Sequence, residues 1–403
     1  MKTIDKVLLF TGSGVNFPWN GATSEAITKK LTDNNRFYGL IKECLSKNIE
    51  RPINFEDIIS TIDNLFLFYR GKQHLIDSEI PIIFEVKSDL AEYINRRCST
   101  GNQLDFIEEM FYGAINIIVK QISDYSIIID EKGESNDLLA DFLKRINKNN
   151  IIRAYTTNYD RLFIDVCNQS KNHKITFSDG FIIDTNIKSS GSENIDEGER
   201  LRGLRLENVL NQRNINCYYN LHGSIYWDWN HEEKQFMLAI KPIDLHLHSV
   251  NLRKDSIETG NPNEPFLLSP IITGFKKTQR LSLPPFNAYN NSFFNDCLEC
   301  DTWLIIGYSF SDSHLNNLMK TAISHRREIP KIIYIDKQDG NNLKNGYNLN
   351  ANFQDIFNSQ VYKIFDKYKH LDDYLFCSND NKIFLYFDGF ETFLKNNIWH
   401  SIL

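Results

Sequence analysis

Apolar residues in the first third of the chain recur every three or four positions, which is the spacing of amphipathic helices. In residues 54–69 they fall at positions 55, 58, 59, 62, 65, 66 and 69, and residues 104–122 repeat the pattern at greater length. Residues 136–150 form a third such segment, with Asn136 or Asp137 near its start as a helix N-terminus favours. The pattern predicts a mostly helical unit over residues 24–150.

A second pattern flanks this unit: short runs of β-branched and aromatic residues, each ending in a polar or glycine-containing turn. These runs lie within residues 8–17, 151–160, 214–224, 301–312 and 330–338. Uninterrupted apolar runs of this length are typical of parallel strands that are buried on both faces of a sheet. The sequence therefore predicts an α/β protein with a Rossmann-like parallel sheet and a large helical insertion after the first strand.

The length of 403 residues exceeds the size of one hydrophobic core, so we expect more than one packed unit. We divide the chain into a domain that contains the predicted sheet, formed by residues 1–23 and 151–340, a helical insertion at 24–150, and a C-terminal extension at 341–403. Residues 382–403 read as a strand followed by a helix that closes the domain or aids assembly.

Composition narrows the class of protein. The formal charge of −7 disfavours direct binding of nucleic acid as a general function, and we expect no membrane partner because no run approaches the roughly 20 apolar residues that a membrane span needs. The seven cysteines are odd in number and scattered, as in proteins with reduced thiols. We therefore expect a cytoplasmic protein.

The carboxyl ends of parallel strands meet at one edge of a sheet, where α/β proteins bind their ligands. The first strand ends in Thr11-Gly12-Ser13-Gly14. Glycine lacks the Cβ atom that would keep a phosphate from the backbone, so this turn is a candidate phosphate cradle. It could equally be only a tight turn.

The next two strand ends carry Asn158 with Asp160, and His222 followed by Gly223. An amide and a carboxylate two residues apart can hydrogen-bond a ribose diol, although the pair could also cap the following helix. A histidine at a strand end can act as a base near neutral pH, although such a residue is more often structural.

The fourth strand end, Gly307-Tyr308-Ser309, is a small-residue turn that suits a phosphate or a ribose. Asp336 ends the fifth strand, where an acidic group could hold the adenosine ribose of a dinucleotide.

In order and form, these motifs resemble those of sirtuin-type proteins. The family's Gly-Ala-Gly loop corresponds to residues 12–14, its Thr-Gln-Asn-Ile-Asp-x-Leu loop to 156–162, its catalytic His-Gly to 222–223, and its Gly-Thr-Ser loop to 307–309. The resemblance runs from residue 6 to about residue 340 by motif order. Each block is weak alone, and together they form a specific signal.

Two departures separate the chain from sirtuin deacylases. Residues 17–21, Phe-Pro-Trp-Asn-Gly, lack the Asp-Phe-Arg that follows the glycine loop in those enzymes, and the only close cysteine pair is Cys297 with Cys300. A four-cysteine zinc ribbon is therefore not expected, we expect no metal, and we interpret the pair as reduced core thiols.

With these departures, the chain resembles a bacterial branch of sirtuin-like proteins that hydrolyse NAD⁺ in anti-phage defence, some of them with a HerA-type ATPase. The resemblance implies an NAD⁺ glycohydrolase that forms ADP-ribose and nicotinamide, and such a protein is expected to assemble as a homo-oligomer. Asn158 would position the ribose hydroxyls and the attacking water, and His222 would accept a proton. Asp160 would steady its loop or contact the nicotinamide side.

The resemblance further implies that the remaining candidate residues line the phosphates and riboses: Thr11, Gly12, Ser13, Gly14, Gly307, Ser309 and, at the adenosine end, Asp336. Two alternatives stay open. One is an NAD-dependent protein deacylase, and the other is a non-catalytic module that binds NAD or ADP-ribose.

Overall fold

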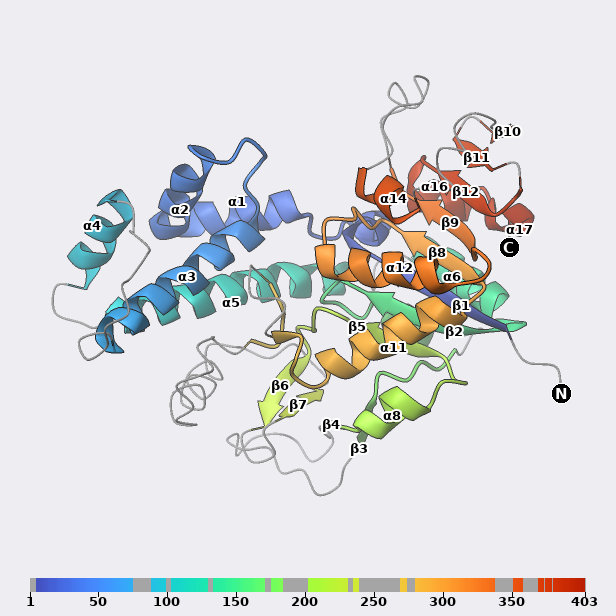
Figure 1. Cartoon of the computed structure of the whole chain (residues 1–403), viewed down its shortest axis with the longest axis horizontal. Helices are drawn as coiled ribbons and strands as arrows, with labels where there is room; N and C mark the ends of the chain where they lie inside the picture. The colour runs from blue at the N-terminus through green and yellow to red at the C-terminus, as the bar shows by residue number, and fades with distance from the viewer. Residues whose placement is uncertain are drawn as a thin grey trace.

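A computed structural model of the chain shows a central sheet covered by helices, with a group of helices beside it (Figure 1). It describes residues 5–74, 88–98, 103–129, 133–170, 175–183, 202–230, 235–238, 269–273, 280–337, 351–357, 369–372, 374–378 and 380–402.

The main sheet has eight strands in the order β10-β11-β12-β9-β8-β1-β2-β5, and its strands from β12 to β5 are all parallel to their neighbours. Strands β10 and β11 extend it as an antiparallel edge. In spatial order the strands are Lys369–Asp372, Leu375–Cys377, Ile383–Tyr386, Lys331–Ile335, Thr302–Ile306, Asp5–Thr11, Asn150–Thr156 and Cys217–Asn220. The predicted α/β fold with a Rossmann-like parallel sheet is confirmed.

The central strand β1 is apolar on both sides because both faces of the sheet are covered. Leu8 and Phe10 belong to the hydrophobic cluster on one face, and Val7 and Leu9 to the cluster on the other. Successive side chains of a strand point to opposite faces, so a strand that is buried on both sides must be apolar throughout.

Each face is covered by its own set of helices. On the first face lie α11 (Phe286–Glu299), α12 (Ser313–His325) and α14 (Ala351–Ile356). On the second lie α6 (Gly133–Asn147), α7 (Leu162–Gln169), α16 (Gly389–Lys395) and α17 (Trp399–Ile402). Strand β12 and helices α16 and α17 confirm that a strand and then helical structure occur within residues 382–403, and a role in closing the domain or aiding assembly stays a prediction.

The predicted helical insertion forms a separate group at the left of Figure 1. It consists of α1 (Ser24–Asn34), α2 (Arg36–Ser46), α3 (Phe55–His74), α4 (Ser88–Arg97) and α5 (Gln103–Ile129). Helix α6 follows in sequence, but its Leu139 and Leu143 pack in the cluster on the second face of the sheet. The division of the chain into domains stays a prediction.

A second, smaller sheet was not predicted from the sequence. It is antiparallel, in the order β3 (Phe181–Ile183), β4 (Arg202–Leu204), β7 (Gln235–Leu238) and β6 (Trp227–Asn230), and helix α8 (Leu206–Asn211) follows β4. It packs on α11 through Trp227, whose ring centroid lies 5.4 Å from that of Phe286 and 5.9 Å from that of Tyr289.

A buried ion pair joins the main sheet to α11. Nε of Arg153, on β2, donates to Oδ2 of Asp296 at 2.6 Å, and both side chains are 0% exposed. Arg213 reaches the other carboxylate oxygen at 2.6 Å. Buried charges are tolerated when they are paired and hydrogen-bonded in this way.

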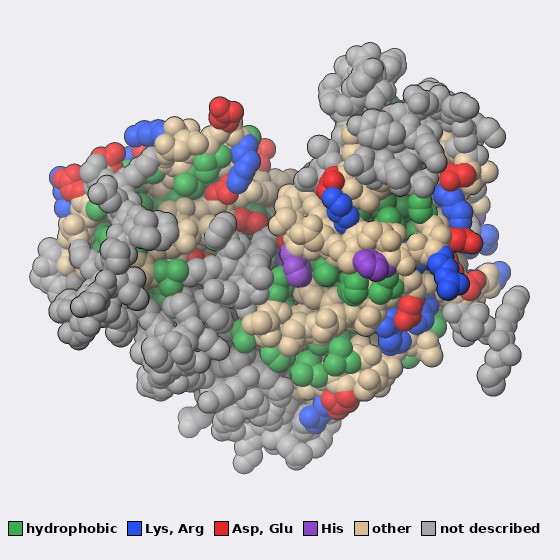
Figure 2. Space-filling model, in the orientation of Figure 1, with side chains coloured by type: hydrophobic (Ala, Val, Ile, Leu, Met, Phe, Trp, Pro, Cys, Tyr) green, Lys and Arg blue, Asp and Glu red, His purple; other side chains and the backbone are tan. Residues whose placement is uncertain are grey.

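On the face drawn in Figure 2, acidic and basic side chains of the described residues are interspersed, and hydrophobic side chains reach the surface in small groups. Of the helices in the described ranges, none combines the length and the apolar character needed to cross a membrane.

Candidate active site

The strand order brings the predicted loops to one edge of the sheet. From β1 the chain continues to β2 and β5 on one side, and later strands β8 and β9 lie on the other side of β1. The strand order therefore switches direction at β1, and such a switch point is where open α/β sheets bind ligands. Backbone hydrogen bonds join the strand ends: the Thr157 N–H donates to the Thr11 carbonyl at 3.0 Å, and the Leu221 N–H donates to the Thr156 carbonyl at 2.8 Å.

A cavity of about 910 Å³ opens at this edge. Its walls include the loops after β1, β2, β5 and β8, together with the first turns of α1 and α3 from the helical insertion. Binding pockets for small molecules and cofactors typically enclose about 300–1,000 Å³. The cavity is therefore large enough for a dinucleotide-sized ligand.

The first loop is pressed against the fourth. A Cβ atom on Gly12 would lie 2.6 Å from the Gly307 carbonyl oxygen, and one on Gly14 would lie 2.6 Å from the Gly307 Cα. Gly307 itself has a φ of 58°, a conformation that glycine adopts without strain. The close approach of two backbones thus explains why glycine is needed at these three positions.

The same contact uses backbone donors of the glycine turn. The N–H of Gly12 donates to the Ile306 carbonyl at 3.0 Å, and that of Gly14 donates to the Gly307 carbonyl at 2.9 Å. Gly12 and Ser13 line the cavity. Gly14 and Gly307 belong to the contact between the two loops and are not among the residues that line the cavity.

Asn158, on the second loop, lines the cavity and is 8% exposed. Its Nδ2 donates to the Gly12 carbonyl at 3.1 Å and lies 3.4 Å from Oδ1 of Asn16. Asn220 holds the loop in place, because its Nδ2 donates at 2.8 Å to the backbone carbonyls of both Asn158 and Asp160. The amide is therefore fixed between the first and second loops.

Asp160 has the contacts of a residue that fixes its loop. Its Oδ1 accepts from the Leu162 N–H at 3.0 Å, at the start of α7, and its Oδ2 accepts from Nδ2 of Asn16 at 2.7 Å. Burial raises the pKa of this carboxyl, and the two hydrogen bonds partly offset the rise. Asp160 also lines the cavity, and a contact to the nicotinamide side stays a prediction.

His222, on the third loop, lines the cavity with its side chain only 6% exposed. Its backbone is held by the segment 269–273, because the Ile272 N–H donates to the His222 carbonyl at 2.7 Å. The next residue, Gly223, has a φ of 87°, and a Cβ atom there would lie 2.0 Å from the Pro270 carbonyl oxygen. This contact accounts for the His-Gly pair.

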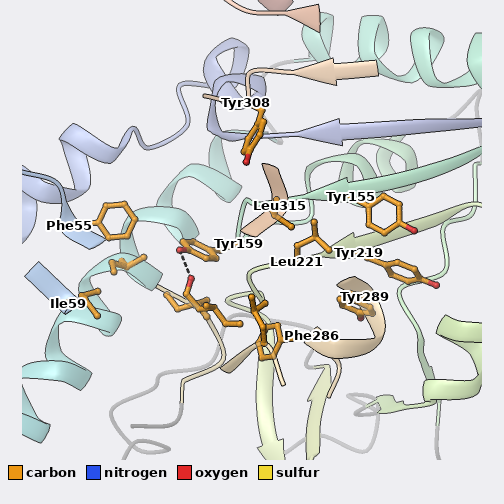
Figure 3. Packing of buried hydrophobic residues seen from close by; sticks show 14 of the residues in the cluster. Phe55, Ile59, Tyr155, Tyr159, Tyr219, Leu221, Phe286, Tyr289, Tyr308 and Leu315 are labelled. Carbon is orange, nitrogen blue, oxygen red and sulfur yellow. Dashed lines mark hydrogen bonds between the residues drawn. The ribbon is translucent and has the colours of Figure 1, made fainter. Parts of the chain in front are cut away.

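Helix α3 packs near the same segment. The Tyr159 hydroxyl donates to the Ile272 carbonyl at 3.2 Å. Figure 3 draws this bond as a dashed line and shows Phe55 and Ile59 of α3 to the left of Tyr159. A buried ion pair also joins α3 to this region, because Nη2 of Arg280 donates to Oδ1 of Asp63 at 3.0 Å. The helical insertion is thus connected to the segment that holds His222.

The fourth loop supplies hydroxyl groups and a carboxylate. Ser309, Ser311 and Ser313 all line the cavity, and Oγ of Ser309 lies 3.0 Å from Oγ of Ser311. Asp312 lines it too, and its Oδ2 lies 3.0 Å from Nε2 of His222. Hydroxyl groups can hydrogen-bond the phosphate and ribose oxygens of a nucleotide.

Besides Gly14 and Gly307, two further predicted residues lie outside the lining of the cavity. Thr11 is buried at the end of β1, where its carbonyl accepts from the Thr157 N–H. Asp336 directly follows β9, and its Oδ2 accepts from the Tyr334 hydroxyl at 2.7 Å. Burial raises the pKa of Asp336, and the bond from Tyr334 lowers it. A role for Asp336 at the adenosine ribose stays a prediction.

Several residues of the site were not predicted from the sequence. The loops are fixed by Asn16, Asn220 and Asp312. The part of the cavity wall formed by the insertion contains the charged side chains of Arg51 and Asp57. These residues carry no motif of their own. Their only signal is a position next to a strand end or a helix start.

Within the described ranges, no three or more His, Cys, Asp or Glu side chains lie close enough together to hold a metal ion. Cys297 and Cys300 are buried free thiols in the core, as interpreted from the sequence, and burial raises the pKa of both well above the ordinary value.

A comparison with known families agrees with this geometry. The family model described as a SIR2-like domain matches residues 153–357, just over half of the chain. The chain belongs to the SIR2-like family. SIR2-like domains use NAD⁺ and form a family of NAD-dependent enzymes, which supports an NAD-related activity for this chain. No curated protein matches it.

The matched range begins in β2, so β1 and its glycine turn lie outside it. The structure nevertheless places β1 at the centre of the SIR2-like sheet, paired in parallel with β2 and β8. Gly12 and Ser13 therefore line the same cavity as the SIR2-like residues Asn158 and His222.

Proposed function

We propose that the chain is an NAD⁺ glycohydrolase, which converts NAD⁺ and water to ADP-ribose and nicotinamide. The observation that carries the proposal is that Asn158 and His222 line one cavity together with the glycine turn and the serine-rich loop after β8. The dimensions of the cavity and the family's use of NAD⁺ support the same conclusion.

The reaction requires positioning more than strong acid. The bond between nicotinamide and C1′ of the ribose breaks with its electron pair going to the ring nitrogen, so the leaving group is neutral nicotinamide. A water oxygen then bonds to C1′, and the water's proton passes to a base. Holding the reacting groups in place and stabilising charge supply most of the rate enhancement in such a site.

Each residue has a role that suits its contacts. Asn158 is held by Gly12 and Asn220 and would orient the ribose hydroxyls and the attacking water. His222 would take the proton. Ser13 and Ser309 would hydrogen-bond the phosphates and riboses, and Asp160 would keep the second loop in position.

The biological role that we propose is depletion of NAD⁺ in anti-phage defence, in the cytoplasm. It is supported by the resemblance to bacterial sirtuin-like NAD⁺ hydrolases in motif order, in the helical insertion and in the sequence after the glycine turn. A HerA-type ATPase partner and a homo-oligomeric assembly are parts of the same proposal, on the same resemblance.

Chromatography of the products tests the activity. We expect the purified chain, alone or with a HerA-type ATPase from the same genome, to release nicotinamide and ADP-ribose from NAD⁺ in equal amounts. Turnover that requires an acylated peptide and forms O-acyl-ADP-ribose would instead identify a deacylase. Binding of NAD⁺ without turnover in either mixture would identify a binding module.

A further inference from the structure

Asp312 makes two separate contacts with its two carboxylate oxygens. Oδ1 accepts from the backbone N–H groups of His314 and Leu315 at 3.0 and 3.1 Å, and so caps the N-terminus of α12. Oδ2 lies 3.0 Å from Nε2 of His222, and both side chains are 6% exposed. The carboxylate therefore connects a helix end to the imidazole in the cavity.

The helix cap fixes the direction of the second oxygen. A carboxylate whose Oδ1 is held by two backbone donors cannot turn freely, so Oδ2 presents a fixed acceptor to the imidazole. An ionised carboxylate has no hydrogen to donate, so Nε2 of a neutral imidazole must carry the hydrogen of this bond. The lone pair of the ring is then on Nδ1.

We propose that Asp312 is a positioning residue that fixes the ring orientation and the tautomer of His222. The inference rests on the proposed role of His222 as the base in NAD⁺ hydrolysis. A base must keep one unprotonated nitrogen, and a carboxylate that holds the hydrogen on Nε2 keeps Nδ1 in that state. The same carboxylate stabilises the imidazolium that forms when the ring takes a proton.

A role of Asp312 in capping α12 alone would not require its contact with His222. Capping of α12 uses Oδ1, and any short polar side chain at the N-cap can supply one acceptor. The contact of Oδ2 with His222 adds nothing to the cap, and it lies at the wall of the cavity that both residues line. The two contacts can therefore be separated by mutation.

Asp312→Asn separates them while conserving shape. The asparagine Oδ1 still accepts at the helix start, because Asn and Asp are equally good N-caps, but its NH₂ group replaces Oδ2. Nε2 of His222 would then have to accept, and the hydrogen would move to Nδ1. Asp312→Ser is the second variant, since it keeps a capping oxygen and places no donor against the imidazole.

The kinetic test compares NAD⁺ turnover of these variants. We expect Asp312→Asn to lower kcat by about 10²–10⁴-fold with little change in KM, as loss of the correct tautomer does in other histidine-carboxylate pairs. Asp312→Ser should lose less. Asp355→Asn is the matched control, because Asp355 is an exposed acid that pairs with Lys320 of α12 away from the cavity, and it should turn over like the wild type.

A second readout does not depend on any activity. Nitrogen NMR of chains labelled at histidine distinguishes the two tautomers, and the His222 signals are assigned by their loss in His222→Gln. We expect the wild type to carry hydrogen on Nε2 and Asp312→Asn to carry it on Nδ1, with melting temperatures close to one another. If the wild type shows no NAD⁺ turnover, the proposed function fails, and this readout still decides the role of Asp312.

Either of two results would overturn the inference. One is a His222 tautomer that is the same in the wild type and in Asp312→Asn. The other is an Asp312→Asn chain, folded like the wild type, whose kcat is unchanged.

Discussion

Replacing Asp63 by Leu should destabilise the protein and also impair the site. Asp63 lies on α3 and pairs with Arg280, and both side chains are 2% exposed. Nη1 of Arg280 also donates to the Thr273 carbonyl at 2.9 Å, next to Ile272, whose N–H holds the His222 carbonyl. The substitution would remove the Asp63 carboxylate from the buried guanidinium of Arg280, beside the segment that positions the imidazole.

The magnitude follows from the burial. Removing one partner of a fully buried ion pair typically destabilises a protein by about 3–5 kcal/mol, because the remaining charge stays uncompensated. At about 2 °C per kcal/mol for a large domain, the melting temperature should fall by about 6–10 °C. Replacing both partners, as in Asp63→Leu with Arg280→Met, removes the buried charge and should recover most of this loss.

Urea unfolding of the two single variants and the double variant measures the coupling, and nicotinamide release at low temperature measures the site. Glu391→Gln is the control, because Glu391 forms an exposed pair with Lys395 and its loss should change the free energy of unfolding by less than about 1 kcal/mol. The reasoning is refuted if Asp63→Leu unfolds like the control, or if the double variant is as unstable as the sum of the single variants.

Three further predictions concern the loops, the core and the pH dependence. Gly307→Ala should destabilise the fold and weaken NAD⁺ binding in calorimetry, because a Cβ at φ 58° would lie 2.4 Å from backbone atoms, whereas Gly133→Ala meets nothing within 4 Å and should behave like the wild type. Asp296→Asn leaves Arg153 buried without an ionised partner and should lower the free energy of unfolding by about 3–5 kcal/mol in urea. Burial lowers the pKa of His314 in the folded state, so its stabilising contribution is present above the unfolded pKa of about 6.5 and is lost as the pH falls through the folded value. Between about pH 8 and pH 5 the wild type should therefore lose more stability than His314→Gln, measured as the difference in urea midpoints.

The sequence was informative where burial and periodicity coincide. β1 and β2 are apolar on both faces because the sheet is covered on both sides, so their runs could be recognised, and their polar ends had to meet at one edge. The apolar runs therefore sufficed to predict that Asn158 and His222 lie at the same edge of the sheet, where both line one cavity.

Other features depend on tertiary contacts that no local pattern encodes. Asp312 and Asn220 look like an ordinary cap and an ordinary strand residue, and only the folded chain brings them to His222 and to the Asn158 loop. The glycine turn could be read as a phosphate cradle, but the packing of Gly12 against Gly307 became visible only in three dimensions. The small antiparallel sheet was not predicted because its strands have only three or four residues, too few for a recognisable pattern.

The most direct test of the central claim is the rate of nicotinamide release from saturating NAD⁺ by the wild type and by His222→Ala, measured under the conditions in which the wild type is active. With His222 as the base in a cavity shared by the four loops, the variant should still bind NAD⁺ and should release nicotinamide about 10²–10⁴-fold more slowly. Release at the wild-type rate by a folded His222→Ala chain would contradict the account.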